Sequence, residues 1–374
     1  MMADVATINP HLLTVPAYVP GKSMEELQRE FGVEEIIKLG SNENPLGPSP
    51  KAIEAARQAL ANMHLYPGVE VYNLRRKLAA SLGSGFDADN VIIGNGSADI
   101  ILSLANAFLF YRGEVIISYP AFQMYELATK MYGGRCVFVE SQDYHYDLQA
   151  MADKITDQTR MIFVTNPNNP TGLIVSQGEV DDFMQRVPSS VIVVFDEAYR
   201  EYVDAPEYPD SIQHVREGHN VVITRTFSKV YGLAGMRLGY GIARKEIIGW
   251  LLHTQPAFHT GRLALIAAMA ALEDRGHVRR TQSVIAEGKK HLYRNFQEMG
   301  LKYLPSQSNF ILLIDLPHDV EVINQALLRR GVILRPTAPF GIPQAIRVTI
   351  GTQKENERVV RTLKQVLAEL DCSS

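Results

Sequence analysis

A lysine and an arginine, Lys229 and Arg237, lie eight positions apart in the glycine-rich stretch 224–241, TRTFSKVYGLAGMRLGYG. The residues 221–224 (VVIT) form a short apolar run that is typical of a buried strand. Lys229 therefore follows the end of a predicted strand, where α/β proteins place their ligand-binding groups. A lysine in that setting can act as a nucleophile if it is partly desolvated or lies near other cations. The alternative is an ordinary solvated lysine in a turn.

A glycine turn comes before a predicted helix in the stretch 94–102, GNGSADIIL. Gly94 and Gly96 allow the backbone to approach an anion closely, because glycine carries no side chain. Ser97 and Ala98 would then offer the first amides of the helix to a phosphate group. The alternative is a tight strand-to-helix turn that binds no ligand.

Two more polar motifs follow apolar runs. Asp196 ends the most apolar run of the chain, 191–195, and Tyr199 comes three residues later. A carboxylate at a buried strand end needs a cation or a strong hydrogen-bond donor, so Asp196 predicts a ligand that carries a proton. Its alternative role is that of a helix N-cap, with Tyr199 in the core. Asn169 lies in TNPNNPTG, which is either a ligand-binding loop or a plain turn.

Alternating strand and helix patterns must position these motifs. The β-branched runs lie at 90–94, 114–118, 135–140, 161–165, 191–195 and 221–224, with helical patterns at 97–110 and 122–132 between them. Nearly continuous apolar runs suit strands that are buried on both faces. We therefore predict a three-layer α/β/α domain with a mainly parallel sheet over residues 41–274.

A smaller α+β domain is predicted over residues 275–374. It begins with a helical stretch at 276–300 and continues with apolar runs at 309–315, 332–335 and 346–351 before a last helix. The N-terminal segment 1–40 contains SMEELQREFG, in which Ser23 is the expected N-cap, Glu26 its capping-box partner and Gly32 the stop signal. We expect this segment to pack on the smaller domain.

The composition is that of an ordinary soluble globular protein. The 374 residues are 46% hydrophobic and 21% charged, with a formal net charge of −4. The mild acidity argues against nucleic acid as the main partner, and the apolar runs are too short to span a membrane. The two cysteines, Cys136 and Cys372, form neither a zinc motif nor a disulfide framework. We therefore expect a cytoplasmic protein with no metal site.

Taken in chain order, these motifs resemble those of fold-type I aminotransferases that depend on pyridoxal 5′-phosphate (PLP). The resemblance is closest to the class II histidinol-phosphate aminotransferases and extends over nearly the whole chain. The matching stretches are PAYVPGKS at 16–23, LGSNENPLGP at 39–48, LYPG at 65–68, DEAYREY at 196–202, the lysine stretch 224–241 and IRVTIGT at 346–352.

The resemblance implies a role for each cofactor residue. Lys229 would form a Schiff base with PLP and act as the general base and acid that moves the proton. Asp196 would keep the pyridinium nitrogen protonated, which makes the ring an electron sink. The other implied cofactor residues are Ser97, Ala98, Ser228 and Arg237 at the phosphate, Tyr199 and Asn169 at the ring hydroxyl, and Phe122 stacked on the ring.

The resemblance also implies substrates and a partner. The enzyme would exchange an amino group between histidinol phosphate and 2-oxoglutarate in histidine biosynthesis. Arg347 would bind the α-carboxylate of glutamate, and the implied anion site also includes Arg335, Tyr18 and Tyr66, with Asn44 nearby. Tyr66 would reach the partner subunit's site, so the resemblance implies a homodimer.

Two features depart from the family pattern. The family often has R-x-P-F-N where this chain has Gln255, Ala257 and His259 in QPAFHTG, and G-S-D-E where it has G-S-A-D. Parts of the substrate motifs are shared with aromatic amino-acid aminotransferases and with a PLP-dependent threonine-phosphate decarboxylase. These two activities are the alternatives to a histidinol-phosphate aminotransferase.

Overall fold

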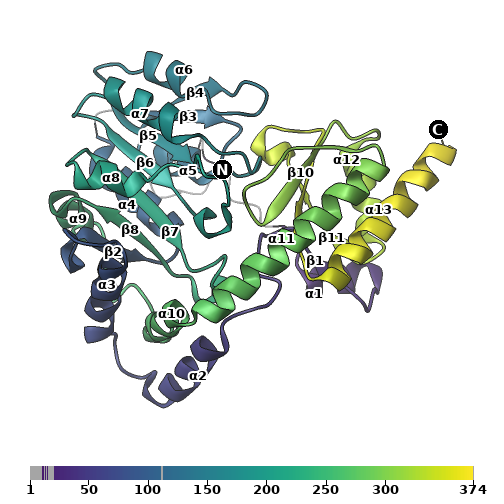
Figure 1. Cartoon of the computed structure of the whole chain (residues 1–374), viewed down its shortest axis with the longest axis horizontal. Coiled ribbons are helices and arrows are strands. Elements are labelled where there is room, and N and C mark those ends of the chain that lie inside the picture. Colours follow the sequence, from purple (N-terminus) through teal and green to yellow (C-terminus); the bar gives the residue numbers. More distant parts are fainter. Residues whose placement is uncertain (1–10, 12, 14, 16–20, 111–112, 374) are drawn as a thin grey trace, which may run out of the picture.

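The computed structural model describes residues 11, 13, 15, 21–110 and 113–373. Within these residues the chain forms two lobes, each with its own sheet and its own apolar core. Figure 1 shows the lobes side by side, with the long helix α11 (Arg275–Glu298) running from one to the other. Tyr18 lies outside the described residues.

A seven-stranded sheet organises the larger lobe in the order β2-β8-β7-β6-β5-β3-β4. The strands are β2 (Val91–Gly94), β3 (Glu114–Tyr119), β4 (Arg135–Glu140), β5 (Thr159–Thr165), β6 (Ile192–Asp196), β7 (Val221–Thr226) and β8 (Gly239–Ala243). Strand β8 is antiparallel to β2 and β7, whereas the other neighbouring strands are parallel. The predicted mainly parallel sheet is thus confirmed, and each predicted apolar run in this lobe forms a strand.

Strand β8 was not predicted, and its glycines explain why. Its sequence GYGIA lacks the β-branched run that marks the other strands. A Cβ atom on Gly239 would come within 2.5 Å of the Gly96 carbonyl carbon and of the Ser97 amide nitrogen. Glycine at this position therefore lets β8 pack closely against the turn that follows β2. The need for a glycine here depends on the tertiary structure, so the local sequence does not reveal it.

Helices cover both faces of this sheet, which confirms the three-layer prediction. Alternate strand residues point to opposite faces, so Ile192 and Val194 pack on one side while Val193 and Phe195 pack on the other. The first face carries α4 (Ser97–Phe108), α5 (Met124–Met131) and α9 (Lys245–Leu252). The second carries α2 (Pro50–Ala59), α3 (Val69–Ser81), α6 (Leu148–Asp153), α7 (Gln177–Arg186), α8 (Ser211–Arg216) and α10 (Arg262–Glu273).

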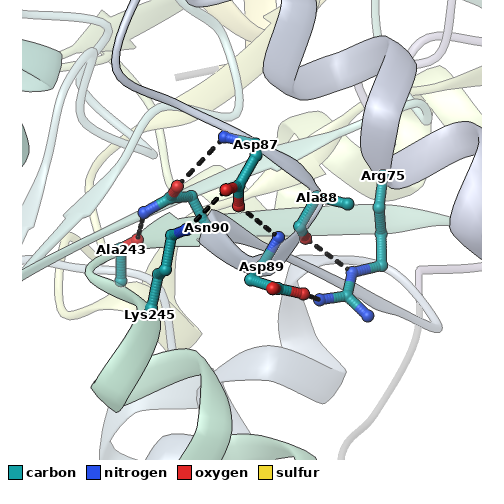
Figure 2. Close-up of polar contacts among 7 residues, drawn as sticks. All are labelled: Arg75, Asp87, Ala88, Asp89, Asn90, Ala243 and Lys245. Carbon is teal, nitrogen blue, oxygen red and sulfur yellow. Dashed lines mark hydrogen bonds and ion pairs between the residues drawn. The ribbon is translucent and has the colours of Figure 1, made fainter.

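Polar contacts fasten the beginning of β2 to the end of β8 (Figure 2). The Asn90 side-chain amide donates to the Ala243 carbonyl oxygen at 3.0 Å. Asp87 forms an ion pair with Lys245, the first residue of α9. These contacts fix the register of β2 beside β8, and with it the position of the glycine turn at the other end of β2.

The smaller lobe is built on an antiparallel sheet in the order β12-β13-β10-β9. Its strands are β9 (Lys302–Tyr303), β10 (Phe310–Ile314), β12 (Arg335–Pro336) and β13 (Ile346–Thr349), and α11, α12 (Val320–Leu328) and α13 (Gln353–Ser373) pack around them.

Residues 21–40 of the N-terminal segment lie against this smaller lobe (Figure 1), whereas His11 lies beside Gly133 of the larger lobe. Strand β1 (Ile37–Lys38) pairs in parallel with β11 (Val332–Ile333). Helix α1 (Met24–Phe31) has the predicted capping box between Ser23 and Glu26 and ends at Gly32 with φ of 66°. Both helix signals are therefore confirmed.

Candidate active site

A cavity of about 430 Å³ opens at the carboxyl ends of the central strands, between the two lobes. It follows the ends of β5, β6 and β7, which is where ligands bind in α/β sheets. Most of the residues singled out in the sequence line it: Ser97, Ala98, Phe122, Asn169, Asp196, Tyr199, Ser228, Lys229, Arg237, Arg335 and Arg347. The fold thus gathers motifs that are up to 250 residues apart in the chain.

Asp196 is the last residue of β6 and is only 3% exposed. Its Oδ2 accepts a hydrogen bond of 2.8 Å from the Tyr125 hydroxyl group, which is fully buried in α5. Its Oδ1 has no hydrogen-bond partner among the described residues. Burial raises the pKa of Asp196, because removal from water disfavours the charged carboxylate. The cavity therefore holds a buried acceptor that a cationic N–H group of a ligand could satisfy.

Lys229 lies three residues beyond the end of β7 and is half-buried. Its Nζ donates to the Ser41 carbonyl oxygen at 3.2 Å and lies 5.5 Å from the centre of the Tyr199 ring. The Tyr199 hydroxyl group accepts a hydrogen bond of 3.0 Å from the Asn42 side-chain amide. An amine thus points into the cavity beside a fixed aromatic ring.

One corner of the cavity has the features of a phosphate site. Helix α4 begins here after Gly96, whose φ is 82°, so the first amides of the helix face the cavity. The Arg237 Nη1 lies 3.4 Å from the Ser228 Oγ. A Cβ atom on Gly96 would come within 2.8 Å of the Arg237 Nη2, so the guanidinium group lies close to this turn, whose positive φ favours glycine. Helix amides, a hydroxyl group and an arginine together suit an anion.

Two arginines of the smaller lobe form the opposite side of the cavity. Arg335 on β12 lies directly across from Arg347 on β13 in the antiparallel register. Arg347 is 5% exposed and lies between the rings of Phe310 and Phe340, at 5.2 and 5.5 Å from their centres. It donates to the Asn169 side chain and, at 2.9 Å, to a backbone carbonyl oxygen. The cavity therefore has a second cationic region, away from the helix terminus.

Two predicted residues lie elsewhere. Tyr66 is 76% exposed, stacks on Phe258 with ring centres 4.6 Å apart, and does not line this cavity. Asn44 is buried, and its amide donates to the Val230 carbonyl oxygen at 2.8 Å and to the Thr281 hydroxyl at 3.1 Å. Its side chain thus joins the glycine-rich stretch to α11 instead of facing the cavity, which differs from the position we expected.

Several residues of the site were missed in the sequence. Tyr125 and Asn42 hold the polar groups of Asp196 and Tyr199, as described above. Next to Asp196, Glu197 accepts a hydrogen bond of 2.8 Å from Arg225, and both residues are buried. This ion pair joins the ends of β6 and β7, the strands that carry Asp196 and Lys229. The sequence signals that could have predicted this ion pair were the second carboxylate in DEAY and the arginine in RTFSK.

The departure in QPAFHTG lies behind the glycine turn. The Gln255 amide donates to the Ile93 carbonyl oxygen at 2.7 Å, and the His259 ring nitrogen Nε2 lies 3.1 Å from the same oxygen. The Asn95 amide in turn donates to the His259 carbonyl oxygen at 2.9 Å. These side chains support the turn from outside the cavity, whereas Ala98 of the second departure, G-S-A-D, lines the cavity.

Comparison with known proteins identifies the family. A model of the family "Aminotransferase class I and II" matches residues 34–363. This chain belongs to that family. A histidinol-phosphate aminotransferase of Moorella thermoacetica is 47% identical over 98% of this chain and 95% of its own length. A histidinol-phosphate aminotransferase of Akkermansia muciniphila is also 47% identical, over 96% of this chain and 98% of its own.

Solved structures of aminotransferases share the fold. The histidinol-phosphate aminotransferase of Sinorhizobium meliloti, solved in complex with pyridoxal-5′-phosphate, superposes with a TM-score of 0.89 at 27% identity. That likeness covers 99% of this chain and 100% of the other. The predicted fold type is thereby confirmed. In the part of the chain that the structure describes, no helix is both long and apolar enough to cross a membrane.

Proposed function

We propose that this aminotransferase uses PLP to exchange an amino group between L-histidinol phosphate and 2-oxoglutarate, a step of histidine biosynthesis. The proposal rests mainly on how the charged side chains are arranged in one cavity. A lysine amine and a buried carboxylate lie between two cationic regions, one at a helix terminus and one at Arg335 and Arg347. The names of the similar proteins support the same substrate.

The residues of the cavity fit PLP at three points. The start of α4, together with Ser228 and Arg237, suits its phosphate group. The Asp196 Oδ1, which lacks a partner among the described residues, suits its ring nitrogen. Lys229 provides an amine that can hold the cofactor covalently. When bound, the ring of this cofactor accepts electron density from the substrate carbon that loses its proton.

Each residue then has a defined task in our proposal. Asp196 keeps a proton on the ring nitrogen of the cofactor, because a carboxylate stabilises that cation. Lys229 takes the proton from the substrate Cα through its Nζ and would deliver it to the C4′ atom of the cofactor. Tyr199 and Asn169 orient the ring hydroxyl, and Phe122 packs on the ring face.

The two arginines serve both amino donors. Glutamate presents its carboxylates and histidinol phosphate presents its phosphate group, and a guanidinium group binds either anion with two parallel hydrogen bonds. Arg347 is fixed between aromatic rings, whereas Arg335 lies at the neighbouring position. Within this site we propose that Arg335 recognises the phosphate group, a contact that an uncharged aromatic side chain does not need.

We further propose a cytoplasmic homodimer in which Tyr66 completes the partner subunit's site. Tyr66 lies outside the cavity of its own chain and stacks with Phe258 on an exposed surface. Other exposed apolar side chains of α2, α3 and the loop between them are Ile53, Leu60, Met63, Leu65, Val69 and Tyr72. Burial of such side chains against a second copy would favour association.

A comparison of substrates tests the proposed activity. The purified enzyme is assayed with 2-oxoglutarate and either histidinol phosphate or phenylalanine. We expect a clear preference for histidinol phosphate in kcat/KM and one glutamate formed per amino group lost. A preference for phenylalanine would identify an aromatic amino-acid aminotransferase. Because histidinol phosphate carries no carboxyl group, a third assay uses threonine phosphate, from which release of carbon dioxide without glutamate would identify a decarboxylase.

Borohydride reduction tests the role of Lys229. Reduction should fix the cofactor to the protein, and peptide mapping should find the pyridoxyl group on Lys229. Lys229→Ala should lose nearly all transamination, because the covalent anchor and the proton carrier disappear together. A label on a different lysine would contradict the assignment.

A further inference from the structure

A second group of side chains, which could coordinate a metal ion, lies away from the active site at the end of α8. His214, Glu217 and His219 each place one ligand atom within 4.8 Å of the others. The Glu217 Oε2 lies 3.9 Å from the His214 Nδ1 and 3.8 Å from the His219 Nε2. His214 and His219 are separated by four residues, a spacing that occurs in zinc sites, and the proposed transamination does not use them.

The buried histidine of this cluster has unmet hydrogen-bonding capacity. His214 is only 5% exposed, and neither of its ring nitrogens has a hydrogen-bond partner among the described residues. A buried polar group without a partner is costly, so a ligand that satisfies it would stabilise the fold.

The neighbouring carboxylates support a metal role. The Glu217 Oε1 accepts a hydrogen bond of 2.7 Å from Gln213, which leaves Oε2 directed at the two imidazoles. On the other side of the ring, the His214 Nε2 lies 3.7 Å from an Asp181 carboxylate oxygen on α7. If Asp181 closes to hydrogen-bond distance when a metal binds, its carboxylate would orient the ring and make it a stronger ligand, as in many zinc sites.

We propose that His214, Glu217 and His219 form a binding site for a divalent transition-metal ion such as Zn²⁺. Two imidazoles and one carboxylate suit Zn²⁺ and related ions better than Mg²⁺ or Ca²⁺, which prefer oxygen ligands. Water would fill the fourth position, because the side chains of Glu217 and His219 are about half exposed. These two can move the short distance that separates the present spacing from bonds of about 2.0–2.2 Å.

The ion would act on the fold and not on the transamination itself. The three ligands span the turn between α8 and β7, and β7 leads to Lys229. An ion that binds the folded chain alone stabilises it by mass action. We therefore expect zinc to raise the thermal midpoint of the protein, with no requirement for zinc in the reaction.

A zinc titration of the cofactor-loaded, metal-free full chain tests the proposal. Calorimetry with zinc chloride should find one tight site per chain. His219→Ala and Glu217→Gln should each weaken that site by at least about tenfold, and Asp181→Asn should weaken it by about tenfold or more. These side chains are partly exposed, so the variants should fold.

His253→Ala removes an exposed histidine outside the cluster and serves as the matched control. It should bind zinc as the unchanged protein does, and magnesium chloride should leave the thermal midpoint of both proteins unaltered. The proposal is overturned if the unchanged protein has no saturable zinc site below millimolar concentration. It is also overturned if His219→Ala and Glu217→Gln bind zinc as tightly as His253→Ala.

Discussion

At the scale of single residues, the clearest electrostatic feature is the carboxylate of Asp196. One of its oxygens is held by Tyr125, and the other has no protein partner among the described residues although it is buried. Such an oxygen costs free energy unless a donor meets it. A protonated ring nitrogen would meet that need, so cofactor binding and the electrostatics of this one side chain depend on each other.

Asp196→Asn should therefore retain PLP but lose most of the turnover. The amide can stay near the ring nitrogen but cannot stabilise its positive charge. Loss of one charge-assisted hydrogen bond of about 1.5–3 kcal/mol predicts a rate lower by roughly ten- to a hundredfold. The measurement is kcat at saturating PLP, with the exposed N-cap variant Asp319→Asn as control. Unchanged turnover in Asp196→Asn would mean that this carboxylate is only structural.

The two arginines should differ in their effects on substrates. Arg347→Ala should slow the half-reactions with both glutamate and histidinol phosphate, because it removes the arginine that is fixed between Phe310 and Phe340. Arg335→Ala should slow histidinol phosphate more than phenylalanine, whose side chain carries no charge. The loss of about 1.5–3 kcal/mol corresponds to roughly a ten- to hundredfold change in kcat/KM for the phosphate substrate.

Absorbance changes of the cofactor in single-turnover experiments can measure each half-reaction separately. If Arg335→Ala slows phenylalanine as much as histidinol phosphate, Arg335 does not recognise the phosphate group. The aromatic amino-acid aminotransferase would then describe this chain better.

At the scale of secondary-structure elements, the close contact between β8 and the glycine turn determines the phosphate corner. Gly239 faces the backbone of Gly96 and Ser97 so closely that a methyl group has no room. Gly239→Ala should displace the turn, weaken PLP binding and lower the free energy of unfolding by about 1–3 kcal/mol. Equilibrium titration with PLP and chemical denaturation measure the two effects.

Gly249→Ala is the matched control, because Gly249 lies in α9 with open space around its Cα. It should leave PLP affinity unchanged and stabilise the protein by about 0.5–1 kcal/mol, since alanine favours a helix. Equal PLP affinities in the two variants would show that the turn does not depend on the contact with β8.

The same elements show what a sequence can and cannot predict. Apolar, β-branched runs predicted the parallel strands because their burial depends on local residue type. Strand β8 depends on space left by another segment, so its glycines gave no local signal. Likewise, the end of β6 predicted Asp196, but Tyr125 and Asn42 meet their partners only through tertiary packing. The family resemblance placed Asn44 near the substrate, whereas its side chain donates a hydrogen bond to Thr281 of α11.

At the scale of the whole molecule, Tyr66 connects the proposed activity to assembly. We expect Lys229→Ala and Tyr66→Ala each to have low activity when alone. Mixed in equal amounts under conditions of subunit exchange, they should recover about a quarter of the activity of the unchanged enzyme, because half of the dimers then hold one complete site. Activity is measured before and after mixing, and light scattering gives the size of the assembly.

The control mixes Lys229→Ala with Asp196→Asn, both of which damage the site of their own chain, and should recover nothing. If the first mixture also fails to recover while the protein is a dimer, Tyr66 does not act in the partner's site.

The division between the two lobes has a consequence for changing this enzyme. Arg335 and Arg347 lie on a sheet of the smaller lobe, whereas the proposed cofactor residues follow strands of the larger one. In our proposal, recognition of the substrate and the chemistry thus lie mainly on different lobes, which also pack together at Tyr199 and Val230. Directed evolution confined to β12 and β13 should be able to alter which amino acid is accepted while the inherited reaction stays intact.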